Sequence, residues 1–288
     1  MANIKELKKK IKSTKSTLKI TQAMKLVSAA KLNRAQQAIQ SARPYALELE
    51  DTIKTVSALV QDYSHEYLEG NDSKHSVLLV ISANKGLCGG YNSQLAKEVK
   101  KFVTASNEDI KVYYVGRKVK ELIQKEVNSG KTFTFDKADA SFAEIQSIGN
   151  ELAAMFKTKE VGKVYVAYNV FESAISFIPT VKQILPLSMD EKVREELKEK
   201  YPFDFKYQPS PEVILDTLIP EAYTSTLWTC MLDAVAAEHG SRMTAMDSAV
   251  GNCKEEIRSQ TLKMNKLRQA AITTELIEVV SGAESLNG

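Results

Sequence analysis

The chain of 288 residues has little of what marks secreted, membrane-spanning and disulfide-rich proteins. Its three cysteines, Cys88, Cys230 and Cys253, are too few and odd in number for a disulfide framework, so we expect a reducing compartment. The longest apolar run, Val77 to Ile81, is far shorter than the roughly 20 residues that span a bilayer. The charged N-terminus has no apolar segment behind it, so we expect no secretory signal peptide.

Residues that carry chemistry are also scarce. The sequence has only three histidines, and they are scattered without metal-ligand spacing: His65, His75 and His239. Glu275 and Glu278 lie three apart in a helix-like segment, a spacing that can serve acid–base chemistry. Because they lie near a helix end with no pocket around them, a solvated face is the better interpretation. We therefore expect no catalytic residues, no metal and no cofactor.

A glycine loop is the one motif typical of a nucleotide site. Gly86–Gly90 follows the strand-like run Ser76–Ala83 and precedes the helix-like segment Ser93–Val103. Its order matches neither the phosphate-binding loop G-x-x-x-x-G-K-[ST] nor the dinucleotide motif G-x-G-x-x-G. Cys88 within it could be a nucleophile, but no histidine lies near it in sequence. We favour a tight turn between strand and helix over a ligand site.

Positive charge is concentrated at the N-terminus. The net charge is only +3, yet residues 1–34 carry ten Lys or Arg and a single acid, Glu6. Such a basic arm predicts an acidic partner, which could be nucleic acid, lipid head groups or an acidic protein surface. The arm has no interleaved aromatic residues, which argues against nucleic acid.

Both ends of the chain show helical periodicity. Residues seven positions apart from Ile4 to Val60 are all apolar except Lys25, and the companion series is small or hydroxylated from Thr14 to Ala42; this pattern is typical of a coiled coil. Pro44 interrupts neither series, so we predict a bend there and not a stop. A second stripe runs from Leu232 to Ala271 in steps of three and four.

The start of the C-terminal helix is marked by a capping sequence. Ser210-Pro211-Glu212 places proline at the first turn, so we expect the helix to begin there. We expect Pro220 to break it early.

The middle of the chain alternates strands with helices. The expected strands are Ser76–Ala83, Ile110–Val115, Thr132–Phe135, Lys163–Val170 and Ile175–Leu185, the last antiparallel at one edge; the expected helices are Ser93–Val103, Val119–Glu126, Phe142–Phe156 and the charged segment Met189–Lys200. This order predicts a Rossmann-like, mostly parallel α/β domain inserted between two coiled-coil helices. We divide the chain into an N-terminal helix (1–70), the α/β domain (71–208) and a C-terminal helix (209–288).

Four motifs together resemble a known family. Ile272–Ser285 (ITTELIEVVSGAES) and Lys19–Lys31 (KITQAMKLVSAAK) resemble the signatures of the gamma subunit of bacterial-type rotary ATP synthases. Gly86–Asn92 is similar to that family's central loop, and Arg242–Met246 with Asn252 to its second helix. The resemblance covers the whole chain in the same order.

The resemblance implies a function. The terminal helices would pair as an antiparallel coiled coil inside a hexamer of alpha and beta subunits, and the α/β domain would lie near the epsilon subunit and the membrane ring of c subunits. Proton flow would turn this shaft and so drive ATP synthesis by the beta subunits, while the chain itself would be non-catalytic. The chain would be peripheral to the cytoplasmic face of the bacterial inner membrane, reach the membrane only through partners and bind no nucleic acid.

The resemblance also implies contact residues. Those toward the hexamer would be Lys9, Met24, Lys25, Lys31, Arg34, Arg242, Arg268, Gln269, Thr273 and Glu275; those toward the c-ring and epsilon would be Tyr207 and Gln208. The sequence departs from the family pattern at four places: Gln208 stands where an acid is common, Asn84-Lys85 replaces Asp-Arg, Asp247 replaces a basic residue, and Gly251 replaces a longer side chain.

Two other interpretations stay open at this point. A stand-alone nucleotide-binding α/β protein with a coiled-coil arm would rest on the glycine loop, but no nucleophile–base or metal constellation accompanies that loop. A coiled-coil nucleic-acid binder would bind with a steep dependence on salt.

Overall fold

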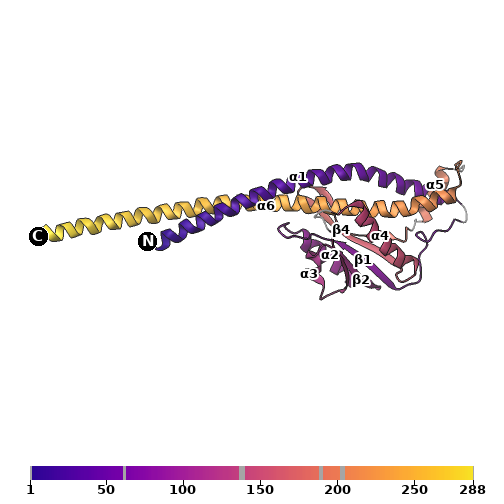
Figure 1. Cartoon of the computed structure of the whole chain (residues 1–288), viewed down its shortest axis with the longest axis horizontal. Helices are drawn as coiled ribbons and strands as arrows, with labels where there is room; N and C mark the ends of the chain where they lie inside the picture. The colour runs from indigo at the N-terminus through magenta and orange to yellow at the C-terminus, as the bar shows by residue number, and fades with distance from the viewer. Residues whose placement is uncertain (1, 61–62, 136–139, 188–190, 202–204, 288) are drawn as a thin grey trace. The chain divides into compact units, whose positions relative to one another are not determined.

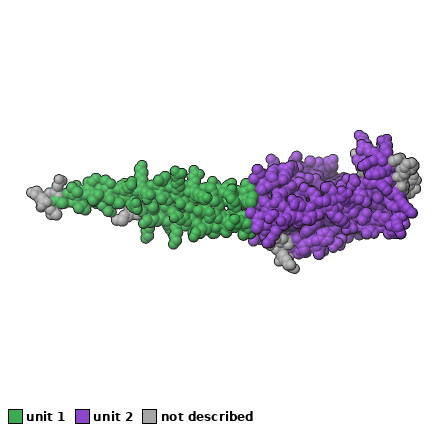
Figure 2. Space-filling model, turned by 90° about the horizontal axis from the view of Figure 1, so that it is seen from above, with its two compact units in different colours: residues 1–28, 242–288 green, residues 29–241 purple. Residues whose placement is uncertain are grey.

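The computed structural model describes residues 2–60, 63–135, 140–187, 191–201 and 205–287. The chain forms two compact units (Figure 2). Unit 1 joins Met1–Ser28 to Arg242–Gly288, and unit 2 is Ala29–Ser241. Two long helices, α1 (Ala2–Leu59) and α6 (Pro211–Asn287), contribute to both units. The three-part division at residues 70 and 208 stays a prediction.

The described part of unit 2 contains a five-stranded sheet of order β3-β2-β1-β4-β5. Its strands are β1 (His75–Ile81), β2 (Asp109–Val115), β3 (Asn128–Phe133), β4 (Lys163–Ser173) and β5 (Ser176–Leu185). The β3, β2, β1 and β4 neighbours pair in parallel, and β5 pairs antiparallel with β4 at one edge. The predicted mostly parallel sheet with one antiparallel edge is confirmed.

Both faces of the sheet are covered, which explains why Val77–Ile81 of β1 is an unbroken apolar run. Val77, Leu79 and Ile81 point into a core that also contains residues of α1, α4 (Phe142–Lys157) and α6. Leu78 and Val80 point into a second core with α2 (Tyr91–Ala105) and α3 (Lys118–Ile123). The helices therefore lie on the two sides of the sheet (Figure 1).

The remaining helices follow local signals in the sequence. Helix α4 begins with a capping box, in which Ser141 and Glu144 satisfy each other's backbone N–H groups. The expected charged helix is present as α5 (Glu191–Lys200), and its predicted start at Met189 lies outside the described residues. Helix α3 ends at Ile123, earlier than the predicted Glu126.

Prolines interrupt neither long helix. Helix α1 runs through Pro44 without a stop, as predicted. The expected break at Pro220 is wrong, because α6 continues through it. Proline costs about 3 kcal/mol in a helix interior, and the burial of Ile219 and Tyr223 on either side offsets this at roughly 1.5–3 kcal/mol each. The Thr224 hydroxyl also donates to the Pro220 carbonyl at 3.0 Å.

The predicted seams are the buried faces of both helices. Every described position of the two α1 series is buried or half-buried, including Leu7, Leu32 and Ile53. The α6 stripe from Leu232 to Ala271 is likewise buried or half-buried at each of its positions. The coiled coil predicted from the heptads is confirmed, as are the antiparallel pairing that the resemblance implies and the α/β domain inserted between the two helices.

Candidate partner interface

Unit 1 consists of the start of α1 packed antiparallel against the second half of α6. Leu7 on α1 and Val250 on α6 are buried in the seam. At the small seam position Thr21, the hydroxyl donates to its own helix, to the carbonyls of Thr17 and Leu18. A seam of small residues lets helices approach closely but buries little apolar area. Polar contacts at the margin of the seam therefore supply a larger share of the stability of the helix pair.

Two ion pairs join the helices of unit 1. Lys10 Nζ lies 3.0 Å from Glu256 Oε1, and Lys25 Nζ lies 2.6 Å from Asp247 Oδ1. The Lys10 ammonium and the Gln260 amide both hold the pKa of the Glu256 carboxyl below its usual value. All four side chains are at least 40% exposed, so water and salt screen both pairs and each adds little to the stability of the unit. Their sequence positions run in opposite directions, as an antiparallel pair requires.

The far end of α6 has no packing partner among the described residues. Every residue from Ile272 to Ala283 is exposed, and the apolar side chains there are 49–69% exposed: Ile272, Leu276, Ile277, Val279 and Val280. At roughly 100° per residue these apolar positions lie on the helix face opposite the seam. On the seam side the sequence turns polar, at Thr274 and Glu278. Beyond its seam with α1, the apolar face of α6 has therefore switched sides, so this stretch is not built to pack on α1.

The two units carry net charges of opposite sign. Unit 1 has 14 Lys or Arg and 7 Asp or Glu, a net charge of +7. Unit 2 has 25 Lys or Arg and 29 Asp or Glu, a net charge of −4, so the two account for the +3 of the whole chain. The modest overall charge conceals a strongly basic coiled-coil end, which favours contact with an acidic surface.

Five of the predicted hexamer contacts are exposed on unit 1 and can reach a partner: Lys9, Arg268, Gln269, Thr273 and Glu275. The last four lie close to Ala271, where the seam stripe of α6 ends. The Thr273 hydroxyl donates to the Gln269 carbonyl at 3.0 Å. Its oxygen can still accept a hydrogen bond from a partner.

Three other predicted contacts in unit 1 are less accessible. Met24 is half-buried, and Arg242 is only 7% exposed. Lys25 is half-buried and already bound to Asp247, so its charge is largely compensated within the chain. Because Asp247 stands 222 residues away in sequence, no pattern around Lys25 could reveal this pairing.

The predicted contacts in unit 2 lie at two places. Lys31 is half-buried and Arg34 is exposed on α1. Tyr207 and Gln208 lie in the irregular segment before α6; Tyr207 is half-buried against the core that contains α4 and α6, and Gln208 is exposed. The Gln208–Pro209 peptide bond is cis.

The glycine loop of unit 2 is fastened to its surroundings. Asn92 Oδ1 accepts from the Ala83 N–H at 3.2 Å, and Ser241 Oγ on α6 donates to the Cys88 carbonyl at 2.6 Å. The Tyr91 hydroxyl donates to the Ala234 carbonyl of α6 at 3.0 Å. Gly89 takes a positive φ of 56°, which glycine allows without strain. These contacts support the turn interpretation: the loop joins the α/β domain to α6.

Chemistry of other kinds finds no support in the described residues. None of them form a group of three or more His, Cys, Asp or Glu side chains able to hold a metal ion. Within the same residues, no helix is both long and apolar enough to span a membrane.

Comparison with known proteins decides the family. A family model described as ATP synthase matches residues 3–286. The ATP synthase gamma chain of Geobacter metallireducens is 38% identical over 291 residues, covering 100% of both chains. The chain belongs to the ATP synthase gamma chain family. It is thus a non-catalytic subunit of ATP synthase that forms the enzyme's central shaft, with catalysis in the beta subunits.

Further relatives agree with this assignment. The ATP synthase gamma chain of Erythrobacter litoralis is 40% identical over 297 residues, covering 99% of this chain and 100% of that one. A chain of the Euglena gracilis mitochondrial ATP synthase superposes with a TM-score of 0.66 at 17% identity, covering 99% of this chain and 95% of its own. A chain from the central stalk and c-ring structure of Tetrahymena thermophila gives 0.58 at 22%, covering 80% and 99%. At these identities the structures show the shared fold.

Sequence reasoning missed one group of exposed residues. Leu276, Ile277, Val279 and Val280 are among the most exposed apolar side chains of α6 but were not among the predicted contacts. The signal that could have found them is the phase of the helix: extending the seam past Ala271 in steps of three and four reaches Thr274 and Glu278, not apolar residues.

Proposed function

We propose that this chain is the rotating shaft that couples ion flow through a ring of c subunits to ATP synthesis, and that unit 1 works inside the alpha/beta hexamer. The observation that carries this proposal is the far end of α6. From Ile272 to Ala283 it presents an apolar face on the side away from the coiled-coil seam. An exposed apolar helix face of this kind is typical of a surface that another protein covers.

Apolar contacts suit a part that must turn. Hydrophobic contact is non-directional, so a helix can rotate against an apolar sleeve without breaking a fixed set of hydrogen bonds at each step. The shaft can bias a catalytic site only if it binds that site's conformers unequally, which requires contacts that differ around its circumference. The apolar side and the polar side of α6 at this end provide such a difference.

Electrostatics supports an acidic partner around unit 1. With a net charge of +7, this unit would be drawn to acidic surfaces, such as an acidic lever loop of the beta subunits. We propose direct contacts for the exposed side chains of unit 1, which are Lys9, Arg268, Gln269, Thr273 and Glu275. In unit 2 we propose contacts for the exposed Arg34 and the half-buried Lys31 of α1. We propose that Met24, Lys25 and Arg242 act through packing and helix pairing, because they are half-buried or buried.

The other partners follow the same scheme. We propose that Tyr207 and Gln208 face the c-ring and the epsilon subunit, and that proton translocation drives the rotation. The chain would then be peripheral to the cytoplasmic face of the inner membrane and would reach the bilayer only through these partners. Gln208 is exposed and uncharged, so its part in that contact would be a hydrogen bond and not an ion pair.

The contact assignment is tested with Arg268→Ala and Gln269→Ala. Both side chains are exposed, so we expect unchanged unfolding of the isolated chain but less proton pumping per ATP hydrolysed in the assembled enzyme. The matched control is Lys101→Ala on α2, whose side chain is 76% exposed and lies outside the proposed contacts. Unchanged pumping in well-assembled Arg268 and Gln269 variants would remove these residues from the interface.

The shaft role itself is tested by reconstitution. Alpha and beta subunits from the same source are assayed for ATP hydrolysis with and without this chain. We expect the chain alone to be inactive and the mixture to form a stable complex with higher, cooperative activity. Failure to join the complex, or to change its rate, would count against the proposal.

A further inference from the structure

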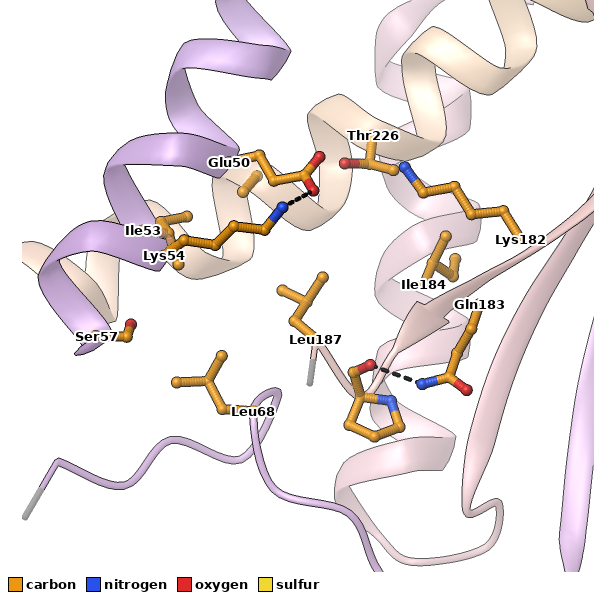
Figure 3. A pocket seen from close by; sticks show the side chains of 12 residues that line it. Glu50, Ile53, Lys54, Ser57, Leu68, Lys182, Gln183, Ile184, Leu187 and Thr226 are labelled. Carbon is orange, nitrogen blue, oxygen red and sulfur yellow. Dashed lines mark hydrogen bonds and ion pairs between the residues drawn. The ribbon is translucent and has the colours of Figure 1, made fainter. Parts of the chain in front are cut away.

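A cavity of about 380 Å³ lies within unit 2 where α1, α6 and the end of β5 meet (Figure 3). It falls within the range of roughly 300–1,000 Å³ typical of small-molecule sites. Its volume is small for that range, so an occupant would be smaller than a nucleotide. No step of the shaft function uses it, and the inference drawn from it does not rest on the proposed function.

One end of the cavity is polar and carries a net positive charge. Glu50 Oε1 lies 2.7 Å from Lys54 Nζ, and Lys182 extends toward the same carboxylate from β5 (Figure 3). Burial alone would raise the pKa of the Glu50 carboxyl, but the Lys54 hydrogen bond and the charges of Lys182 and Lys54 lower it below its usual value. At neutral pH the three groups therefore amount to two ammonium ions against one carboxylate, and Lys182 is the exposed one.

The rest of the cavity is mostly apolar. Ile53 of α1 and Ile184 of β5 are buried in its wall, and Leu68 and Leu187 are half-buried beside them (Figure 3). Ser57 lies at the apolar end of the cavity (Figure 3) and is 6% exposed. Its hydroxyl has no hydrogen-bond partner among the described residues. Buried hydroxyls are almost always hydrogen-bonded, so the Ser57 hydroxyl is a position where a polar group in the cavity can form a hydrogen bond.

We propose that the cavity binds a medium-chain alkyl carboxylate with a hydrogen-bonding group near its far end. The carboxylate pairs with the Lys182 ammonium at the polar end. The alkyl chain lies against Leu68 and Leu187, and the far group bonds the Ser57 hydroxyl. Each part of the ligand thus complements one feature of the cavity wall: the excess positive charge, the apolar middle and the unpaired hydroxyl.

The first measurement is calorimetric titration of the purified full chain with omega-hydroxy carboxylates from hydroxyhexanoate to hydroxydodecanoate. We expect one site per chain, with affinity rising about fourfold per added CH₂ until the far hydroxyl reaches Ser57, and falling beyond that length. Decanoate lacks the far hydroxyl, and decane-1,10-diol carries an uncharged hydroxyl in place of the carboxylate; both should bind more weakly than 10-hydroxydecanoate.

Variants assign the site. Lys182→Met keeps the apolar stem and should weaken 10-hydroxydecanoate about tenfold, to the level of the diol. Ser57→Ala should remove the advantage of 10-hydroxydecanoate over decanoate. Leu187→Trp fills the cavity from a half-buried position, so it should abolish binding without unfolding the chain. Lys101→Met is the matched surface control and should leave affinity unchanged.

Three results would overturn the proposal. Absence of saturable binding at millimolar ligand would remove the site, and binding that survives both Leu187→Trp and Lys182→Met would place it elsewhere. Equal affinities of decanoate and 10-hydroxydecanoate for the unaltered chain would refute the bond to Ser57.

Discussion

Arg43→Met should destabilise unit 2 far more than its position on an exposed turn of α1 suggests. Arg43 Nη2 lies 2.8 Å from Asp233 Oδ1 of α6, and the two side chains are 47% and 10% exposed. Burial raises the pKa of the Asp233 carboxyl above its usual value, although Arg43 and the Phe171 backbone both act to lower it. Without Arg43, the carboxylate would stay buried with its charge uncompensated.

The magnitude follows from this asymmetry. Removing one partner of a fully buried ion pair costs about 3–5 kcal/mol, and the half-exposed guanidinium here reduces that to about 2–4 kcal/mol. Asp233→Asn should cost only about 1 kcal/mol, because the arginine left behind can turn to water. Lys131→Met, which breaks the exposed Lys131–Glu151 pair, is the control and should cost less than about 1 kcal/mol.

The assay is denaturant unfolding followed by fluorescence of Trp228, the only tryptophan and a residue of unit 2. Loss of Arg43 raises the Asp233 pKa further, so protonation at mildly acidic pH removes the uncompensated charge. The penalty of Arg43→Met should therefore be largest at neutral pH and shrink as pH falls. A penalty no larger than that of Lys131→Met, or one that does not shrink, would refute the reasoning.

The other predictions concern four single residues. Cys253 is half-buried and the other two cysteines are buried, so alkylation of the native chain, followed by mass spectrometry, should modify Cys253 first; equal rates would contradict this burial. Burial alone would raise the pKa of the Glu108 carboxyl, but Lys163 and neighbouring hydroxyls lower it below 4.5 in the folded chain. The contribution of this carboxylate to folding stability is therefore present above that pH and is lost as pH falls through the lowered pKa of the folded state. Glu108→Gln should thus cost about 1 kcal/mol near neutral pH and nothing in strong acid, as read from unfolding curves, and a constant cost would exclude the ion pair as its cause. Gly116 has φ +83° and a Cβ there would lie 2.1 Å from a backbone oxygen, so Gly116→Ala should cost at least about 1–3 kcal/mol. Gly251→Ala meets nothing within 4 Å on α6 and should stabilise by up to about 1 kcal/mol, and thermal unfolding of both variants checks the opposite signs.

The sequence predicted those parts of the fold that depend on local periodicity. The seven-residue repeat from Ile4 to Val60 marks the buried side of α1, because a coiled-coil seam must recur at that spacing. The continuous apolar run of β1 predicted a strand, and the alternation with helices predicted parallel pairing.

Errors arose where tertiary packing overrides a local preference. At Pro220 the buried neighbours hold the helix together despite the missing N–H. The start of β3 was missed because Asn128–Lys131 is polar and contains a glycine, which usually marks a turn. There the side chain of Tyr113 packs so closely that a Cβ on Gly130 would lie 2.3 Å from its ring, so glycine is what allows the strand to form.

The candidate interface was predicted unevenly for the same reason. Motif resemblance identified exposed residues such as Arg268 and Glu275 near the end of α6. It could not show that Lys25 is bound by Asp247 or that Arg242 is buried, because both depend on residues that are distant in sequence. Nor did it single out the apolar face that begins at Ile272, which becomes visible only once the end of the α1 seam is known.

Rotation of the chain against the hexamer is the most direct test of its role as a coupling shaft. In a complex with surface-fixed alpha and beta subunits, Cys253 is replaced by serine and a bead is attached through Lys101→Cys on exposed α2. We predict that ATP drives the bead in one direction and that it stops when ATP is removed. Complexes that hydrolyse ATP at full rate while the bead stays still would contradict the account.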